Sequence, residues 1–284
     1  MKIAVIGDAM LDIETVGSWD GDCPENKAVT KFKGVRPVIL PGGAANTAAI
    51  LANKGVTCDG LFNGPGSRDR LWVSELLKQT LKINRIVWSG VGQICVKVRG
   101  IVNNEVAIRI DMDDVSVSGQ SSGFDMALLN MDKWDAVVFC DYNKGSFRAE
   151  TEHIVRELIK KVPITVVDSK RKDYSLWNGA TAICPNQDEG ASIFGSTDPC
   201  VIRNKVGTKC CYVTNGAAGA NCSFNGLVEL IGIDNQVEHP YVVGAGDAFV
   251  AGLVMSLVKG DNFITAGQCG VELAHSYVSR PRKP

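Results

Sequence analysis

The chain has 284 residues, with 30 Lys and Arg against 31 Asp and Glu, so its formal net charge is −1. Nucleic acids and anionic membranes attract clustered positive charge, so this balance argues against either as a partner. The longest transmembrane candidate, 249–258, has about half the length that a membrane-spanning helix needs. Asp8 and Asp12 interrupt the apolar start of the chain, which argues against a signal peptide. We therefore expect a cytoplasmic protein.

Cysteine and glycine are the informative residue counts. The ten cysteines include no C-x-x-C pair, and none of the three histidines lies near a pair of cysteines. Several fall in apolar segments, which favours buried free thiols over disulfides or zinc ligands. The 30 glycines exceed the number of about 20 that an average usage of about 7 % gives. We expect the surplus at turns and at places of close backbone approach.

Short apolar runs alternate with helical patterns along the chain. The residues predict, in chain order, a strand entering a turn at 2–7, helices at 44–54 and 70–81, a hairpin of 93–100 with 105–111, a strand at 136–140, a helix at 149–161, strands at 164–168, 181–184 and 211–214, and helices at 245–259 and 263–278.

This alternation is typical of an α/β fold, in which a parallel sheet carries helices on both faces. The hairpin at 93–111 departs from the repeat. Together with 10–16 and 28–35 it predicts a small accessory sheet attached to the main layer. Ligands of such folds bind at the carboxyl ends of the strands, so polar residues there are candidates for function.

The strongest motif is Gly244-Ala245-Gly246-Asp247, directly before an apolar helix. The glycines let backbone N–H groups approach an anion, and the helix N-terminus adds partial positive charge. An Asp in that first turn is placed to accept a proton from an attacking hydroxyl. The alternative is a simple glycine-rich turn with Asp247 as a helix-start residue.

Two weaker motifs are also helix starts. Gly42 and Gly43 let a ligand lie on the backbone, and Asn46 offers a polyol both a donor and an acceptor. Asn186 and Glu189 share one face of a helical turn after a strand, where they are suited to a hydrated Mg²⁺. Plain helix starts or caps are the alternative for both motifs.

Three more strand ends carry polar residues. Asp141 and Lys144 follow the strand 136–140, and Asp168 and Lys170 follow 164–168; singly, such pairs are more often exposed turns. Thr214 opens a turn that contains Gly216 and Gly219, which suits nucleotide phosphates. The sequence has neither a G-x-x-x-x-G-K-[ST] run nor a G-x-G-x-x-G after the first strand, which disfavours P-loop kinases and standard dinucleotide enzymes.

In this order, the motifs resemble the ribokinase-like (PfkB) carbohydrate kinases. The Gly-Gly-Asn element looks like the first signature of that family, and GAGDAF near the C-terminus looks like the second. The resemblance covers almost the whole chain. It implies one domain, 1–284, with a three-layer α/β/α mostly parallel sheet and a β-sheet lid from about 10–36 and 93–111.

A narrower resemblance is to the heptose-7-phosphate kinases, carried by GDAMLD at 7–12, CPENKAV at 23–29, PGGAANTA at 41–48, IRID at 108–111, DYNKG at 141–145, 166–186 and VTNGAAG at 213–219. It implies ATP-dependent phosphorylation of D-glycero-β-D-manno-heptose 7-phosphate at C1, a step toward the ADP-heptose of lipopolysaccharide. No adenylyltransferase domain follows, so we do not expect that second activity.

The resemblance also implies roles for individual residues. It makes Asp247 the catalytic base and Gly244, Ala245 and Gly246 its anion hole, assigns a water-mediated Mg²⁺ site to Asn186 and Glu189, and assigns the nucleotide to Lys170, Asn186, Thr214, Gly216 and Gly219. For the sugar it implies Asp12, Gly42, Gly43, Asn46, Asp141 and Lys144. Lys97, Arg99 and Arg109 are candidates for the 7-phosphate, because a dianion needs positive partners; surface charge on a lid strand is the alternative. A homodimer through the lid is expected by resemblance alone.

Two departures from the family pattern bear on the nucleotide side. Tyr241 stands where the family usually has an Asp that helps organise a monovalent-cation site, which argues against activation by potassium. The chain also stops, at 279–284, before such kinases normally end. That part usually completes the adenine pocket, so we expect weaker nucleotide binding or closure by a partner chain or another segment.

Two alternatives to a heptose kinase stay open. One is a PfkB kinase for another sugar, such as ribose, fructose or a keto-deoxy sugar acid. The other is a catalytically weak sugar- or nucleotide-binding protein. Tyr241 and the short C-terminus favour this second reading, whereas the intact Asp247, Asn186 and Glu189 oppose it.

Overall fold

The computed structural model describes residues 1–64, 82–88, 94–103, 105–112, 122–233, 237 and 240–280. The helix expected at 70–81 lies outside these residues, as do Gln93 and Asn104 of the expected hairpin. No helix among the described residues is long and apolar enough to span a membrane.

The main sheet is mixed and has the strand order β13-β12-β11-β10-β9-β8-β1-β4-β5. Its strands from β11 to β5 are parallel, and β12 and β13 extend one edge in antiparallel fashion. The strands are β1 (Lys2–Cys23), β4 (Thr57–Asn63), β5 (Arg85–Trp88), β8 (Ala136–Asp141), β9 (Ile164–Ser169), β10 (Ala182–Ile183), β11 (Cys210–Thr214), β12 (Ala220–Phe224) and β13 (Leu227–Ile231).

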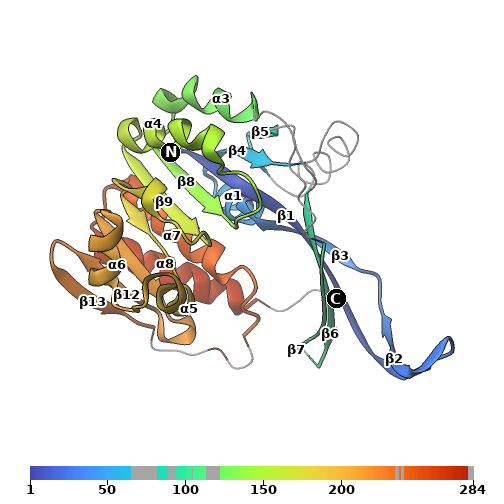
Figure 1. The fold of residues 1–284 in the computed structure, drawn as a ribbon. Helices are drawn as coiled ribbons and strands as arrows, with labels where there is room; N and C mark the ends of the chain where they lie inside the picture. Colours follow the sequence, from blue (N-terminus) through green and yellow to red (C-terminus); the bar gives the residue numbers. More distant parts are fainter. Residues whose placement is uncertain are drawn as a thin grey trace.

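Helices cover both faces of this sheet, as expected for an α/β/α fold (Figure 1). On one face lie α1 (Ala44–Asn53), α7 (Ala245–Lys259) and α8 (Phe263–Val278); on the other lie α3 (Ser122–Leu128), α4 (Glu152–Lys161) and α6 (Pro199–Val206). The short α5 (Gln187–Glu189) follows β10 and continues into a π-helical turn, Gly190–Phe194.

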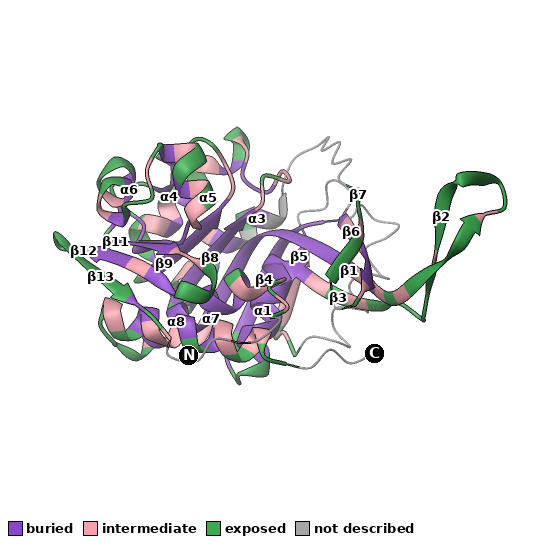
Figure 2. Cartoon of the chain, turned by 90° about the horizontal axis from the view of Figure 1, so that it is seen from below, coloured by how far each residue is buried: buried purple, intermediate pink, exposed green. Residues whose placement is uncertain are grey.

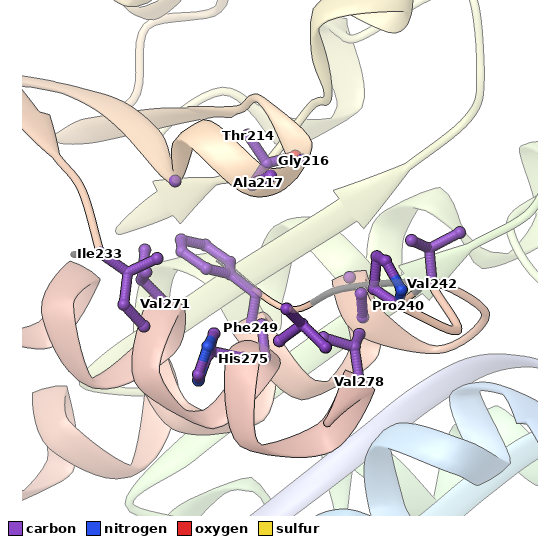
Figure 3. A pocket seen from close by; sticks show the side chains of 15 residues that line it. Thr214, Gly216, Ala217, Ile233, Pro240, Val242, Phe249, Val271, His275 and Val278 are labelled. Atoms are coloured by element: carbon purple, nitrogen blue, oxygen red, sulfur yellow. The ribbon is translucent and has the colours of Figure 1, made fainter. Parts of the chain in front are cut away.

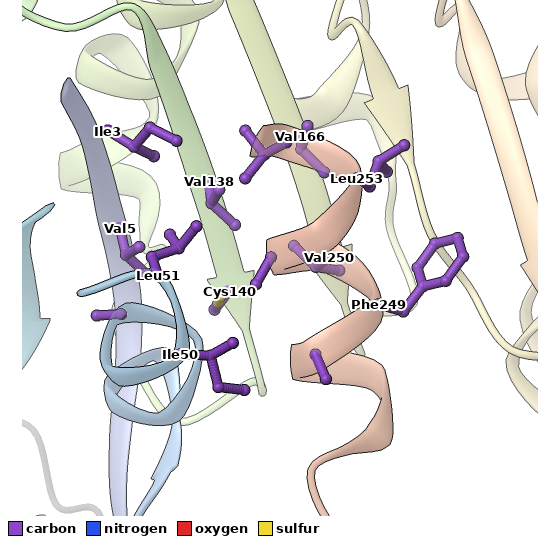
Figure 4. Close-up of a cluster of buried hydrophobic side chains, with 14 of the residues drawn as sticks. Ile3, Val5, Ile50, Leu51, Val138, Cys140, Val166, Phe249, Val250 and Leu253 are labelled. Atoms are coloured by element: carbon purple, nitrogen blue, oxygen red, sulfur yellow. The ribbon is translucent and has the colours of Figure 1, made fainter. Parts of the chain in front are cut away.

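Successive residues of the central strands point to opposite faces and are buried on both. Ile3 and Val5 of β1 pack in the cluster under α1 and α7, whereas Ala4 and Ile6 pack on the other side. Figure 4 shows Leu51 of α1 and α7 side chains over the first of these faces. This packing fixes the N-terminus of α7 near the carboxyl ends of β8 and β9.

The first strand is much longer than the prediction of 2–7. At Gly7 the chain does not turn, because β1 continues to Cys23. A Cβ at Gly7 would lie 2.0 Å from the Cys140 carbonyl oxygen, so this glycine permits close strand approach inside the sheet. The expected separate lid strand at 10–16 is therefore the second half of β1.

The accessory sheet forms around this second half of β1. There β1 pairs with β2 (Asn26–Gly34), β3 (Val38–Gly43) and β6 (Cys95–Val102), and β6 pairs with β7 (Glu105–Met112) as the expected hairpin. The β1–β2 arm extends beyond the rest of the chain and is largely exposed (Figure 2). The main sheet and the lid thus share one strand.

Candidate active site

The N-terminus of α7 forms the centre of the site. Gly244 precedes the helix with a φ of 84°, in the left-handed region that favours glycine. A Cβ there would lie 2.8 Å from Asn46 Nδ2 and 2.9 Å from Tyr277 Cε1. The helix behind it is buried over most of its length, so Asp247 in the first turn is held at the end of a rigid element.

The carboxylate of Asp247 is buried and accepts three hydrogen bonds. Asn46 Nδ2 donates to Oδ2 over 2.7 Å, and the Tyr142 hydroxyl donates to Oδ1 over 2.8 Å. The Thr47 hydroxyl also donates to Oδ1, over 3.3 Å. The side chain is 5 % exposed. The GAGD motif therefore meets the Gly-Gly-Asn motif directly, although 201 residues separate Asn46 from Asp247.

Burial sets the proton affinity of this carboxyl. It raises the pKa of Asp247 to about 6, and the negative charge of Asp168 acts in the same direction. Hydrogen bonds from Asn46 and Tyr142 and the charge of Lys170 oppose the rise in pKa. A carboxylate with a pKa near neutrality is suited to accept a proton from a hydroxyl.

The expected sugar-side residues lie next to Asp247. The Tyr277 hydroxyl donates to Asn46 Oδ1 over 3.2 Å, which fixes the amide orientation. Gly42 and Gly43 end strand β3 immediately before α1, and a Cβ at Gly42 would lie 2.8 Å from Asp12 Oδ2. The structure thus brings Asp12, Gly42 and Asn46 to one side of the α7 N-terminus.

The loop after β8 lies beside them. Asp141 is buried and accepts from the Ser169 hydroxyl over 3.1 Å. Burial and the charge of Asp8 raise the pKa of Asp141 to about 6. The backbone of Lys144 takes part in the loop contacts, since its N–H donates to Asp8 Oδ2 over 3.0 Å.

The three expected phosphate ligands of the lid have different surroundings. Arg99 is buried and forms an ion pair with Asp12, with 2.7 Å between Nη1 and Oδ1. Lys97 Nζ lies 5.7 Å from the centroid of the ring of Tyr142, the residue whose hydroxyl donates to Asp247. Arg109 makes a bidentate pair with Asp111 on the outer strand β7, at 2.8 Å for each bond.

Asn186 and Glu189 form a reciprocal capping box. Glu189 N–H donates to Asn186 Oδ1, and Asn186 N–H donates to Glu189 Oε2, each over 2.9 Å. Lys170 Nζ lies 2.5 Å from Glu189 Oε1 and 3.2 Å from Asp168 Oδ1. Burial lowers the pKa of Lys170, but these two carboxylates outweigh it and raise the pKa above its ordinary value. Carboxylate and amide oxygens and one lysine thus gather beside the carboxyl end of β9.

An apolar cavity of about 170 Å³ lies on the other side of the α7 N-terminus. It is lined by the turn at 214–219, expected to bind the nucleotide, and by Ala245 and Gly246 of the expected anion hole. In Figure 3 the turn at Gly216 faces His275 and Val278 of α8 across the cavity. The lining residues are Thr214, Gly216, Ala217, Gly219, Ile233, Val237, Pro240, Val242, Ala245, Gly246, Phe249, Val271, Ala274, His275 and Val278. Asn186 joins this group through a parallel bridge to Thr214.

Four contributors were missed by sequence reasoning: Asp8, Thr47, Tyr142 and Tyr277. Asp8 is buried and accepts from the backbone N–H groups of Tyr142, Lys144 and Ser146, so it holds the loop that carries Tyr142. Asp8 and Tyr142 both stand inside motifs that carry the resemblance, GDAMLD and DYNKG. Tyr277 lies in an ordinary helical pattern, and only the fold places it at Asn46.

Comparison with known proteins identifies the family of the chain. A family model described as pfkB family carbohydrate kinase matches residues 1–282. "Bifunctional protein HldE" of Marinomonas sp. is 31 % identical over 277 residues, 93 % of this chain and 57 % of that protein. The protein of the same name from Shewanella sp. (strain ANA-3) is 30 % identical over 275 residues, 91 % of this chain and 56 % of that protein. The chain therefore spans little more than half of these relatives.

Solved structures show the same fold at low sequence identity. Phosphofructokinase-2 from Escherichia coli in complex with potassium has a TM-score of 0.76 at 18 % identity and covers 98 % of this chain and 92 % of its own. Arabidopsis thaliana ribokinase complexed with ribose and ATP has a TM-score of 0.74 at 15 % identity, with the same two coverages. The ribokinase-like fold expected from the motifs is confirmed.

Proposed function

Because the chain belongs to the pfkB family of carbohydrate kinases, we propose that it transfers the γ-phosphoryl group of ATP to the C1 hydroxyl of D-glycero-β-D-manno-heptose 7-phosphate. Family membership makes it a phosphotransferase acting on a sugar hydroxyl. The motif resemblance and the relatives named HldE support the heptose substrate. One observation carries the mechanism: the buried Asp247 stands between a polar sugar side at Asn46 and an apolar cavity.

In the proposed reaction Asp247 acts as the general base. Its carboxylate accepts the proton of the C1 hydroxyl while that oxygen attacks the γ-phosphorus and the bond to the β-phosphate oxygen breaks. The backbone N–H groups of Gly244 and Gly246 at the positive end of α7 stabilise the charge that develops on the phosphoryl oxygens, whereas the Ala245 N–H holds the turn by donating to the Val242 carbonyl oxygen. Asn46 and Tyr142 hold the carboxylate in place throughout.

The cavity is the proposed nucleotide site. Its apolar walls from α7 and α8 suit a purine base, and Gly216 and Gly219, which lack side chains, let phosphates approach the backbone of their turn. Thr214 lies where this turn meets Asn186.

The oxygens of Asn186 and Glu189 are engaged in the capping box and with Lys170, so they fit a Mg²⁺ ion that arrives with the nucleotide and is held through water. Mg²⁺ is usually held by one or two carboxylates together with phosphates and water. Within the described part of the chain, no three or more His, Cys, Asp or Glu side chains gather to hold a metal, so the phosphates would supply most ligands. When bound, the ion would neutralise charge on the β- and γ-phosphates.

For the 7-phosphate we propose Lys97 as the principal ligand, with Arg99 and Arg109 on the same lid sheet. Lys97 projects over Tyr142, near the reacting centre. Arg99 is already paired with Asp12, so its contribution comes through the orientation of that carboxylate.

A kinase assay over a panel of sugars and sugar phosphates tests the proposal. With ATP and Mg²⁺, we expect turnover of the heptose 7-phosphate and formation of the 1,7-bisphosphate. Asp247→Asn should lower kcat by about 10²- to 10⁴-fold, because the general base is lost. The exposed Asp173→Asn is the matched control and should retain wild-type turnover.

Each alternative gives a different result in that assay. Turnover of unphosphorylated sugars only would replace the heptose reading with another PfkB kinase. Thermal shifts with ATP·Mg and sugar phosphate but no turnover would indicate a binding protein. Wild-type kcat in Asp247→Asn would contradict the role of the base.

A further inference from the structure

A buried charged cluster lies in the lid sheet at the level of the site. Asp12 and Glu14 are two residues apart on β1 and point to the same face, and Arg99 reaches them from the adjacent strand β6. Arg99 Nη1 lies 2.7 Å from Asp12 Oδ1 and 3.8 Å from Glu14 Oε1. All three residues are less than 10 % exposed. Two carboxylates thus share one guanidinium, which leaves Glu14 as the more weakly paired member.

Tyr241 supplies the missing donor from a distant part of the chain. Its hydroxyl donates to Glu14 Oε1, the same oxygen that faces Arg99, across 227 residues of sequence. A buried carboxylate without sufficient donors is costly, so this hydrogen bond completes the cluster.

The two ends of the cluster lead to the two sides of the proposed reaction. Asp12 lies against Gly42, which stands two residues before α1, the helix that carries the sugar-side Asn46. On the other side, Tyr241 stands directly before the turn in which Ala245 N–H donates to the Val242 carbonyl oxygen over 3.1 Å, and this turn leads into Asp247. A single hydroxyl therefore joins the lid strand to the segment that begins α7.

We propose that Tyr241 is a positioning residue for phosphoryl transfer. Through Glu14 and Arg99 it holds the turn at 242–246 at a fixed distance from Asp12, so that the sugar is aligned with Asp247 and with the phosphoryl-binding turn. The inference rests on the proposed roles of Asp12 and Asp247. It goes beyond them, because the proposed function gives Tyr241 no role in binding sugar or nucleotide.

A double-mutant cycle tests this coupling. Tyr241→Phe keeps the ring and removes only the hydroxyl, and Glu14→Gln weakens the acceptor. Each should lower kcat/KM for the sugar phosphate about tenfold, the usual scale for a lost hydrogen bond to a charged group. The double variant should also lose about tenfold, instead of the roughly hundredfold expected of independent sites.

The matched control is Thr15→Val. Thr15 neighbours Glu14 on β1 and donates to the Val35 carbonyl oxygen over 2.6 Å, so the variant loses a lid hydrogen bond that does not reach Tyr241. Its kcat/KM should stay within about twofold of wild type. ADP binding should change less than about twofold in Tyr241→Phe, because most of the cavity wall is untouched.

Multiplicative losses in the double variant, or a Tyr241→Phe enzyme that loses thermal stability but retains kcat/KM, would overturn the proposal. Hydrogen–deuterium exchange provides a readout without substrate: amides of 242–249 should exchange faster in Tyr241→Phe than in wild type or Thr15→Val. If wild type leaves the heptose phosphate unreacted, only the proposed substrate fails. The cycle is then run with the sugar that the panel identifies, and the exchange result decides on Tyr241.

Discussion

At the scale of single residues, the environment of Asp247 explains how one carboxyl can serve as a base near neutral pH. Burial disfavours its charged form, whereas donors from Asn46 and Tyr142 stabilise that form. The balance leaves the pKa at about 6, above the ordinary Asp value of 3.8. The carboxylate is thus ionised at neutral pH and still has appreciable affinity for a proton.

The pH dependence of activity should report this balance. Only the ionised Asp247 accepts a proton, so kcat/KM should fall as the pH drops below about 6. Tyr142→Phe removes a donor that lowers the pKa, so its acid limb should move to higher pH. Tyr212→Phe, whose hydroxyl donates to the Phe263 carbonyl oxygen, is the control and should leave the limb in place. A Tyr142→Phe profile that overlays the wild type would contradict this account.

At the scale of elements, α7 is flanked by two glycines, Gly244 and Gly260, which have different surroundings. Gly244 and Gly260 both have positive φ, 84° and 93°. A Cβ at Gly244 would meet Asn46 and Tyr277, whereas one at Gly260 would meet nothing within 4 Å. The first glycine therefore allows close packing as well as the backbone conformation.

Alanine at these two positions should separate strain from crowding. Both substitutions place a Cβ on a left-handed residue, which costs about 1–2 kcal/mol of unfolding free energy. Only Gly244→Ala should also reduce kcat, by at least about tenfold, because it displaces the Asn46 amide that holds Asp247. Urea unfolding and steady-state kinetics measure the two effects. Equal kcat values for both variants would show that Asn46 tolerates the added methyl group.

The accuracy of the sequence predictions differs between elements for physical reasons. Helices 245–259 and 263–278 were predicted with their observed bounds, because each has a continuous apolar pattern and a clear terminal signal. The helix expected at 149–161 begins at Glu152 after a 3₁₀ turn. The predicted end of the first strand was wrong, because the sequence does not reveal whether a glycine turns the chain or allows a neighbouring strand to approach closely.

The candidate site shows the same limit. GAGD and Gly-Gly-Asn were recognisable because each motif is local. Their meeting, with Asn46 donating to Asp247, depends on packing of α1 against α7. Tyr277 and the apolar wall from α8 carry no local signal of chemistry, so only the folded chain identifies them.

At the scale of the whole molecule, the β1–β2 arm lacks a core of its own. Trp19 packs edge-on against Phe32 with 6.0 Å between ring centroids, yet Trp19 stays 48 % exposed, and Val29 and Val35 are exposed as well. Exposed apolar side chains on a projecting arm are typical of an interaction surface. We therefore propose that the homodimer through the lid, expected from the family resemblance, forms at this arm.

Sedimentation of the purified protein tests that proposal. Wild type should be a dimer, and Trp19→Glu should shift it to a monomer, because a charge then occupies the apolar contact. Val201→Glu on α6, which is 46 % exposed and far from the arm, should remain dimeric. A monomeric wild type, or a dimer that survives Trp19→Glu, would exclude this interface.

The long first strand also has a consequence for synthesis at the ribosome. Ile3 pairs with Ala136, and the N–H of Lys2 donates to the side chain of Asp135. Strand β1 thus lies in the middle of the sheet, and β8, one of its two flanking strands, is translated more than 130 residues after it. Pairing across such a separation is slow, so the β8 edge of this apolar strand stays unpaired while the nascent chain grows, even after β4 has paired with its other edge. The same strand that unites lid and sheet in the finished enzyme therefore leaves one apolar edge open during translation, the kind of surface that chaperones protect from aggregation.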